Sequence, residues 1–270
     1  MLDSQGWQRD TLPQLSQLFE NDSEAKAFLL TGSLANPEIE VDCWSDMDVT
    51  VILADEAVAR YTQSLAWLHP FGRLIGAERH ESQLAKTVRV CLEGFKRFDF
   101  VFVPESAVGD SLAQASGLFR RPCLILWSRL PNLEAQFVSS PLSYQDISEP
   151  ELERIINQFW FKAAVAIAKV VRNDLLIGFH LALDLSRDYL LLQMIRRDRE
   201  KLTHIHRIGG WGNEVVHGFA CNMLENAPLE ILNLIAHSCE TFDELALEVL
   251  PNYVARSQLM RPIIEMARKL

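Results

Sequence analysis

The chain has 270 residues and a formal net charge of -10 at pH 7, with 49% hydrophobic and 23% charged residues. These values exclude a disordered or collagen-like chain, and the length is sufficient for two domains of ordinary size. The charge disfavours a broad nucleic-acid-binding surface, which is built from clustered Lys and Arg. It is compatible with a small cationic partner, although an acidic surface also serves solubility.

The compartment is predicted from the cysteines and from the apolar segments. Five scattered cysteines form no C-x-x-C pair, which is typical of a reducing cytoplasm. The first ten residues show neither a basic nor an apolar region of a secretory signal. The most apolar helical segment, 159–171, contains Lys162 and Lys169 and is too short to span a bilayer. We therefore expect a cytoplasmic protein without membrane contact.

Periodicity changes character halfway along the chain. The first part predicts a helix at 4–20, strands at 26–33 and 47–54, a helix at 55–68, a hairpin at 86–104 around Glu93-Gly94, a short helix at 105–116 and a strand at 121–127. The pattern fades into a linker over 131–150. Long amphipathic helices are then predicted at 151–171, 174–200 and 229–250. The fold class is therefore α+β, close to α/β. A mixed β-sheet flanked by helices is expected at 1–145 and a helical bundle at 146–270.

Two aspartates lie at the start of the second predicted strand. Alternation places Asp46 and Asp48 on the same side, where the two carboxylates repel each other unless a cation or water screens them. Upstream, Gly32 allows positive φ and close approach to a ligand, and the Ser33 hydroxyl can donate to phosphate oxygens. Each motif alone is a weak signal, because solvated turns contain the same residues.

A third carboxylate, Asp99, strengthens the prediction of a metal site. Asp99 shares one face of its strand with Val101 and Val103, whereas the phenylalanines of "RFDFVFV" share the other. An aspartate in so apolar a strand needs a partner: a metal, or a simple ion pair with Arg97 or Lys96. If this strand lies beside the one that begins at Asp46, three carboxylates converge. That layout suits metal-assisted nucleotidyl transfer, with two Mg²⁺ ligands and a third group acting as base or further ligand.

The segment "GSLANPEIEVDCWSDMD" resembles the signature of the aminoglycoside 6-adenylyltransferases, streptomycin-modifying members of the DNA polymerase β-like nucleotidyltransferase superfamily. After Gly-Ser, the family has Asn-Pro, an Asp, an aromatic residue and D-x-D at the same spacing, and the matching residues here are Asn36, Pro37, Asp42, Trp44, Asp46 and Asp48. Arg97 and Asp99 match a later Arg-apolar-Asp motif, and "FWFKAAVAIAKVVRNDL" resembles the family's helical domain. The chain departs from the family at Leu34, where Arg is usual, and at Trp127-Ser128-Arg129.

The resemblance implies a function and a set of site residues. It implies transfer of AMP from ATP, with Mg²⁺, to a hydroxyl of a small and cationic acceptor such as streptomycin. Asp46, Asp48 and Asp99 would be catalytic and bind metal, with Gly32 and Ser33 contacting the nucleotide. The helical domain would bind the acceptor, where Asp174 is the matching carboxylate. A monomer or homodimer is expected, without nucleic-acid or membrane partners.

Other interpretations stay open at the sequence level. The acceptor is undetermined, since lincosamide nucleotidyltransferases share the size and two-domain plan, and ATP is not distinguished from other triphosphates. Arg199 and His204 have the R-x4-H spacing of helical ribonuclease toxins, a short motif that arises easily by chance. A pseudoenzyme that only binds its ligand is a further alternative. Within the signature, Asn36 and Asp42 are interpreted as structural, whereas Trp44 either packs the loop or borders the nucleotide.

Overall fold

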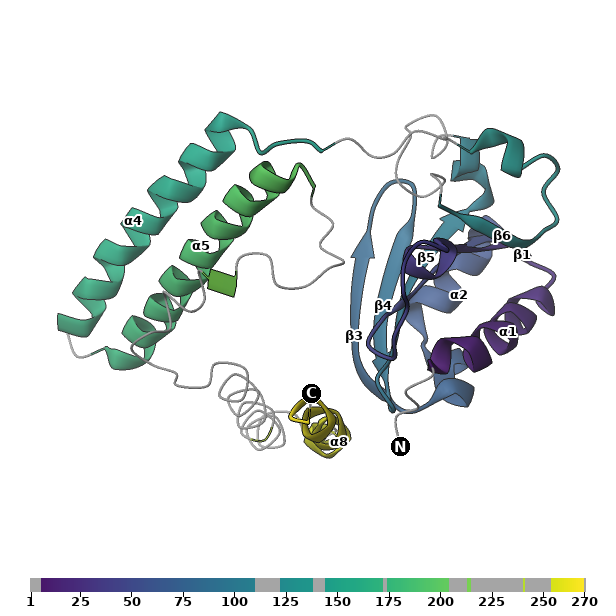
Figure 1. Cartoon of the computed structure of the whole chain (residues 1–270), viewed down its shortest axis with the longest axis horizontal. Coiled ribbons are helices and arrows are strands. Elements are labelled where there is room, and N and C mark those ends of the chain that lie inside the picture. Colours follow the sequence, from purple (N-terminus) through teal and green to yellow (C-terminus); the bar gives the residue numbers. More distant parts are fainter. Residues whose placement is uncertain are drawn as a thin grey trace. The chain divides into compact units, whose positions relative to one another are not determined.

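The computed structural model describes residues 6–109, 122–137, 144–171, 174–203, 213–214, 240 and 254–269. It separates into two compact units, Met1–Leu142 with Ile231–Leu270 and Ser143–Glu230 (Figure 1). Among the described residues, no helix combines the length and the apolar character that crossing a bilayer requires.

The first unit is built on a six-stranded sheet in the order β3-β4-β5-β2-β1-β6. Its strands are β1 (Ala25–Thr31), β2 (Met47–Leu53), β3 (Leu74–Glu81), β4 (Lys86–Leu92), β5 (Lys96–Pro104) and β6 (Leu124–Ser128). The β2–β5 pair is parallel and the other pairs are antiparallel, so the sheet is mixed. The expected α+β class is confirmed, and so is the hairpin formed by β4 and β5.

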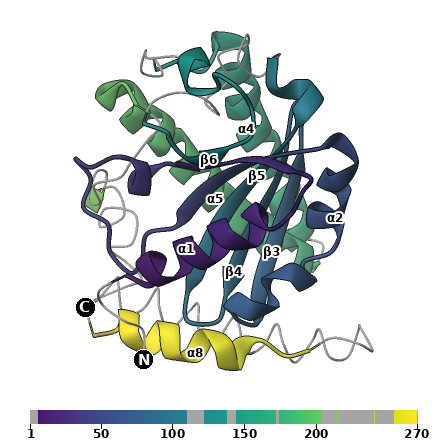
Figure 2. The same cartoon turned by 90° about the vertical axis from the view of Figure 1, so that its right-hand side faces the viewer.

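One face of the sheet is covered by α1 (Trp7–Glu20) and α2 (Val58–Gln63), which lie together on that side (Figure 2). Phe98, Phe100 and Phe102 stack along this face of β5, with successive ring centroids 5.3 and 5.9 Å apart. All three are fully buried, together with Phe19 of α1. Since neighbouring positions in a strand face opposite ways, this packing turns Arg97, Asp99 and Val101 toward the other face.

The helix predicted at 55–68 is wrong in its extent. The segment is divided into a 3-10 turn (Asp55–Ala57), α2 and a second 3-10 segment (Ala66–Phe71). Ser64 interrupts it with an extended backbone, φ -106° and ψ 132°, and its hydroxyl accepts a bond from the Ala66 amide at 3.4 Å. A local side-chain bond of this kind competes with helical hydrogen bonding.

The second unit contains two long helices, α4 (Glu149–Val171) and α5 (Leu175–Lys201), which pack against each other. Lys162 of α4 donates to Asp188 of α5 at 2.7 Å and lies 3.3 Å from Asp184. These are the first two helices expected in the C-terminal half. The third, at 229–250, lies outside the described residues except for position 240. A further helix, α8 (Ser257–Ala267), belongs to the first unit.

Candidate functional site

Gly32 follows β1 in a conformation that suits only glycine. Its φ is 67° and its ψ is -147°. Thr31 pairs with Asp48 across the antiparallel β1–β2 ladder, so the turn passes directly beside that carboxylate. A Cβ at position 32 would lie 1.8 Å from Asp48 Oδ2 and 2.6 Å from its Cγ. Both the backbone and the space therefore require glycine here, and Ser33 opens the short 3-10 turn (Ser33–Ala35) that follows.

The loop from 36 to 45 is held by its own side chains. Asn36 Oδ1 accepts from the Glu38 amide at 3.0 Å, which forms the Asn-Pro turn. Asp42 Oδ1 accepts from the Trp44 amide at 3.0 Å and from the Ser45 hydroxyl at 2.9 Å. Asn36 and Asp42 thus have the structural contacts expected of them.

The far end of this loop is fixed by α1 and by the hairpin turn. Gln8 Nε2 donates to the carbonyl oxygens of Asp42 and Ser45 at 2.9 and 2.8 Å. The Trp44 ring packs edge-on against Phe95, with centroids 5.0 Å apart. Trp44 therefore packs the loop, and the polypeptide leading to Asp46 is anchored at several points.

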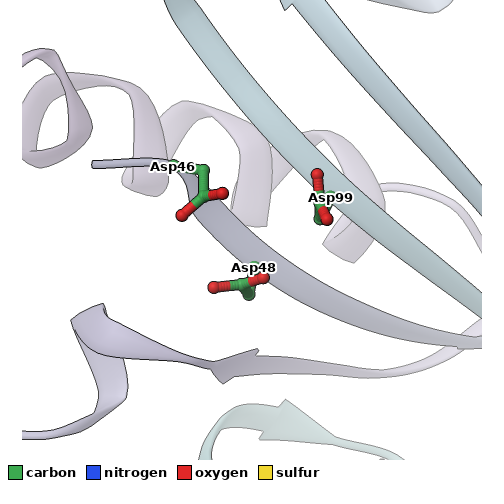
Figure 3. Close-up of side chains that lie close together, drawn as sticks. All are labelled: Asp46, Asp48 and Asp99. Carbon is green, nitrogen blue, oxygen red and sulfur yellow. The ribbon is translucent and has the colours of Figure 1, made fainter. Parts of the chain in front are cut away.

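The three predicted carboxylates come together. Asp48 and Asp99 are register partners on the parallel strands β2 and β5, and Asp46 lies just before β2. Each offers an oxygen, and these oxygens lie within 4.8 Å of one another. Figure 3 shows the side chains directed into a shared space from neighbouring segments. The side chains of Asp46 and Asp99 are 36% and 28% exposed, so an ion could reach them from solvent.

Two arginines contact this cluster. Arg97 Nη2 lies 3.1 Å from Asp46 Oδ2, and Arg89 Nε donates to Asp99 Oδ2 at 2.9 Å. The ion pair of Asp99 is thus formed with Arg89, and not with Arg97 or Lys96, the residues considered as the simple alternative to a metal. The Lys96 ammonium instead donates to the Phe71 carbonyl at 3.1 Å. Arg89 replaces them because antiparallel register places it directly opposite Asp99.

Burial disfavours the ionised form of one member of the cluster, Asp99. Burial raises the pKa of the Asp99 carboxyl, and the Arg89 guanidinium opposes part of that rise. The Asp46 carboxylate acts in the same direction as burial, since like charges favour protonation. Carboxylate oxygens are the ligands that Mg²⁺ prefers, so the residues fit a hard divalent cation.

A pocket of about 300 Å³ opens over this part of the sheet. Its lining residues are Asp46, Gly76, Ala77, Glu78, Arg89, Val90, Cys91, Arg97 and Asp99. A Cβ at Gly76 would meet nothing within 4 Å, so the floor of the pocket is open there. Gly76, Glu78 and Cys91 were not anticipated as site residues. Glu78 lies in β3, and the sequence pattern predicted no strand at 74–81. Had it done so, alternation along that strand could have identified Glu78.

The remaining predicted residues lie elsewhere in the chain. Asp174 precedes α5, where its carboxylate accepts from the Lys169 ammonium at 3.0 Å. Its acceptor-binding role stays a prediction. Arg199 pairs with Asp146 at 2.8 Å, and His204 lies outside the described residues. Lys86, three residues before Arg89 on β4, pairs with Glu81 at 3.2 Å.

Comparisons with known proteins place the chain in a family. The solved structure of an aminoglycoside 6-adenyltransferase from Bacillus subtilis is similar at 14% identity over 94% of this chain and 95% of that one, with a TM-score of 0.32. A nucleotidyltransferase-like protein from Exiguobacterium sibiricum is similar at 12% identity over 98% and 75%, with a TM-score of 0.28. No curated protein matches. The model of the streptomycin adenylyltransferase family matches residues 8–198, so the chain belongs to that family of enzymes, as the signature motif indicated.

Proposed function

We propose that the protein transfers AMP from ATP to a hydroxyl group of a small cationic molecule, an aminoglycoside such as streptomycin, and releases pyrophosphate. The observation that carries this proposal is the convergence of Asp46, Asp48 and Asp99 beside the Gly32-Ser33 turn. The family match supports the same reaction. The cytoplasm, where ATP is plentiful, is the compartment that we propose.

The residues would divide the chemistry between them. Asp46 and Asp48 would hold Mg²⁺, which when bound neutralises charge on the phosphate oxygens. The Ser33 hydroxyl would donate to a phosphate oxygen. Asp99 would either accept the proton of the acceptor hydroxyl or ligate a second ion, and burial, which raises its pKa, makes it a better proton acceptor.

The reaction breaks one bond and forms another at the α-phosphorus. The acceptor oxygen bonds to this phosphorus while the bond to the bridging oxygen of pyrophosphate breaks. The electron pair of that bond leaves with pyrophosphate, and the acceptor proton passes to the base. Positioning and charge neutralisation supply most of the acceleration in such transfers.

Pyrophosphate release tests the proposal directly. The protein is incubated with ATP and Mg²⁺ and with streptomycin, other aminoglycosides or lincomycin in turn. We expect release with one acceptor and its loss in Asp46→Asn/Asp48→Asn. The matched control, Glu81→Gln/Glu93→Gln, removes two exposed carboxylates, one in β3 and one in the turn between β4 and β5, and should retain turnover. Full activity of the Asp46→Asn/Asp48→Asn variant would refute the assignment of these carboxylates.

The same panel identifies the acceptor. Release with lincomycin alone would move the proposal to a lincosamide, and release with aminoglycosides would support the cationic acceptor. Asp174, which precedes α5 in the second unit, is proposed to bind that acceptor. Asp174→Asn should then raise the KM for the acceptor and leave the KM for ATP unchanged, whereas an unchanged acceptor KM would remove Asp174 from the site.

A further inference from the structure

Arg97 is paired with one of the three carboxylates that form the proposed metal site. Its guanidinium lies 3.1 Å from Asp46 Oδ2, on one of the three carboxylates whose oxygens converge. Arg89 does the same at Asp99, at 2.9 Å. In this arrangement the two arginines offset most of the negative charge that would attract a divalent cation. Binding of the ion therefore requires an exchange of partners.

The guanidinium of Arg97 does not use all of its hydrogen-bond donors where it lies. Its Nε is buried and has no hydrogen-bond partner among the described residues. The guanidinium carbon lies 5.4 Å from the centroid of the Phe95 ring, so aromatic contact rather than a second acceptor holds the group. A buried donor without an acceptor is unfavourable, which lowers the cost of moving this side chain.

Arg89 is different, because it bridges two carboxylates. Its Nε contacts Asp99 at 2.9 Å and its Nη1 contacts Glu78 at 3.4 Å. If Asp99 turned to another partner, Arg89 would keep Glu78. Arg97 forms its one described ion pair with Asp46, so losing that carboxylate leaves the guanidinium with the aromatic contact to Phe95 and without an ion pair among the described residues.

We propose that Arg97 is a phosphate-binding residue held in reserve: it pairs with Asp46 in the metal-free enzyme, and a divalent cation displaces it onto the triphosphate. This inference rests on the proposed function, because it assumes a metal and a triphosphate at this site. Arg97 lines the same pocket as Asp46 and Asp99, so a released guanidinium stays within the pocket. Its planar fork matches two phosphate oxygens, and a phosphate would also provide the acceptor that Nε lacks.

The exchange predicts opposite effects on two ligands. Removing the Arg97 charge should strengthen binding of the metal alone, because no cation then competes for Asp46. It should weaken binding of pyrophosphate with metal, because a phosphate contact is lost. A purely structural arginine would instead move both affinities in the same direction, or neither.

The test uses Arg97→Gln in the full-length protein, with Mn²⁺ alone and with inorganic pyrophosphate in saturating Mg²⁺, both by calorimetry. We expect Mn²⁺ to bind several-fold more tightly and pyrophosphate about tenfold more weakly, the loss of one charge-assisted contact. Arg73→Gln is the matched control. It removes an exposed arginine of the same region, paired with Glu93 outside the pocket, and should change neither affinity.

Two further results decide the outcome. Arg97→Lys keeps the charge without the fork, so Mn²⁺ affinity should return to the wild-type value and pyrophosphate affinity should recover in part. Parallel loss of both affinities in Arg97→Gln, or no change in either, would overturn the inference. These binding measurements need no acceptor, so they are separate from the turnover assay. If AMP transfer fails in every acceptor assay while the opposite shifts persist, the proposed function is wrong and the arginine exchange stands.

Discussion

Replacing Gly32 with alanine should lower both the stability of the protein and its affinity for a divalent metal. The backbone at Gly32, φ 67° and ψ -147°, is close to a region that only glycine occupies freely, which costs about 2 kcal/mol for alanine. For a protein of this size that corresponds to a fall of about 6 °C in Tm. The added Cβ would also lie 1.8 Å from Asp48 Oδ2, so this carboxylate must rotate away. We expect Mn²⁺ affinity to fall about tenfold, as when ligand support is lost.

The Gly94→Ala variant separates the two effects. Gly94 also has a positive φ of 78°, but a Cβ there would meet nothing within 4 Å. It should therefore lose stability without losing Mn²⁺ affinity. Thermal unfolding and Mn²⁺ titration of both variants provide the comparison, and introducing Gly32→Ala into Asp48→Ala should show less additional destabilisation than in wild type. Equal Mn²⁺ affinity of Gly32→Ala and Gly94→Ala would refute the reasoning.

Three other perturbations test the charges and contacts of the first unit. Burial raises the pKa of Asp99 despite Arg89, so its ionised form opposes folding above that pKa and the penalty disappears as the pH falls below the unfolded value. Without divalent metal, the Tm of Asp99→Asn should therefore be higher than that of wild type at pH 7, and the difference in Tm should shrink toward pH 3. A difference in Tm that grows on acidification would contradict the raised pKa. Tyr61→Phe removes a bond of 2.5 Å to Asp22 and should cost about 1.5 kcal/mol in urea unfolding, and no loss would show that the bond is not stabilising. Arg129→Met removes donors to three backbone carbonyls and should cost about 2 kcal/mol in the same assay, whereas an effect below the experimental error would leave Arg129 without a structural role.

The carboxylate side of the site was predictable because its neighbours are strongly apolar. The alternating phenylalanines of β5 identify a buried face, which leaves Asp99 on the opposite one. The same argument places Asp46 and Asp48 on one side of β2. Alternation along a strand therefore predicts the face on which a residue lies whenever the residues next to it in sequence are buried in the hydrophobic core.

The partners of these carboxylates were not predictable in the same way. Arg89 meets Asp99 through cross-strand register, which depends on how the β4–β5 turn closes and not on alternation within either strand. β3 carries Glu78 but is an edge strand exposed over most of its length, so its sequence lacks the hydrophobic signal of a strand. Arg129 illustrates a further limit. It is a departure from the family motif in sequence, and the structure shows it clamping the end of α1 to the start of β1.

The site depends on the core that lies behind it. The order β5-β2-β1 brings Asp99, Asp48 and the turn at Gly32 into one row across three strands. A shift of one residue in the β2–β5 register would separate Asp99 from Asp48 and would turn one of the strands toward the wrong face. Burial of Phe98 and Phe100 against α1 and α2 makes that shift costly. Aromatic packing on one face of the sheet therefore determines how closely the carboxylates approach on the other face. Core substitutions in β5 should for this reason impair metal binding before they unfold the protein.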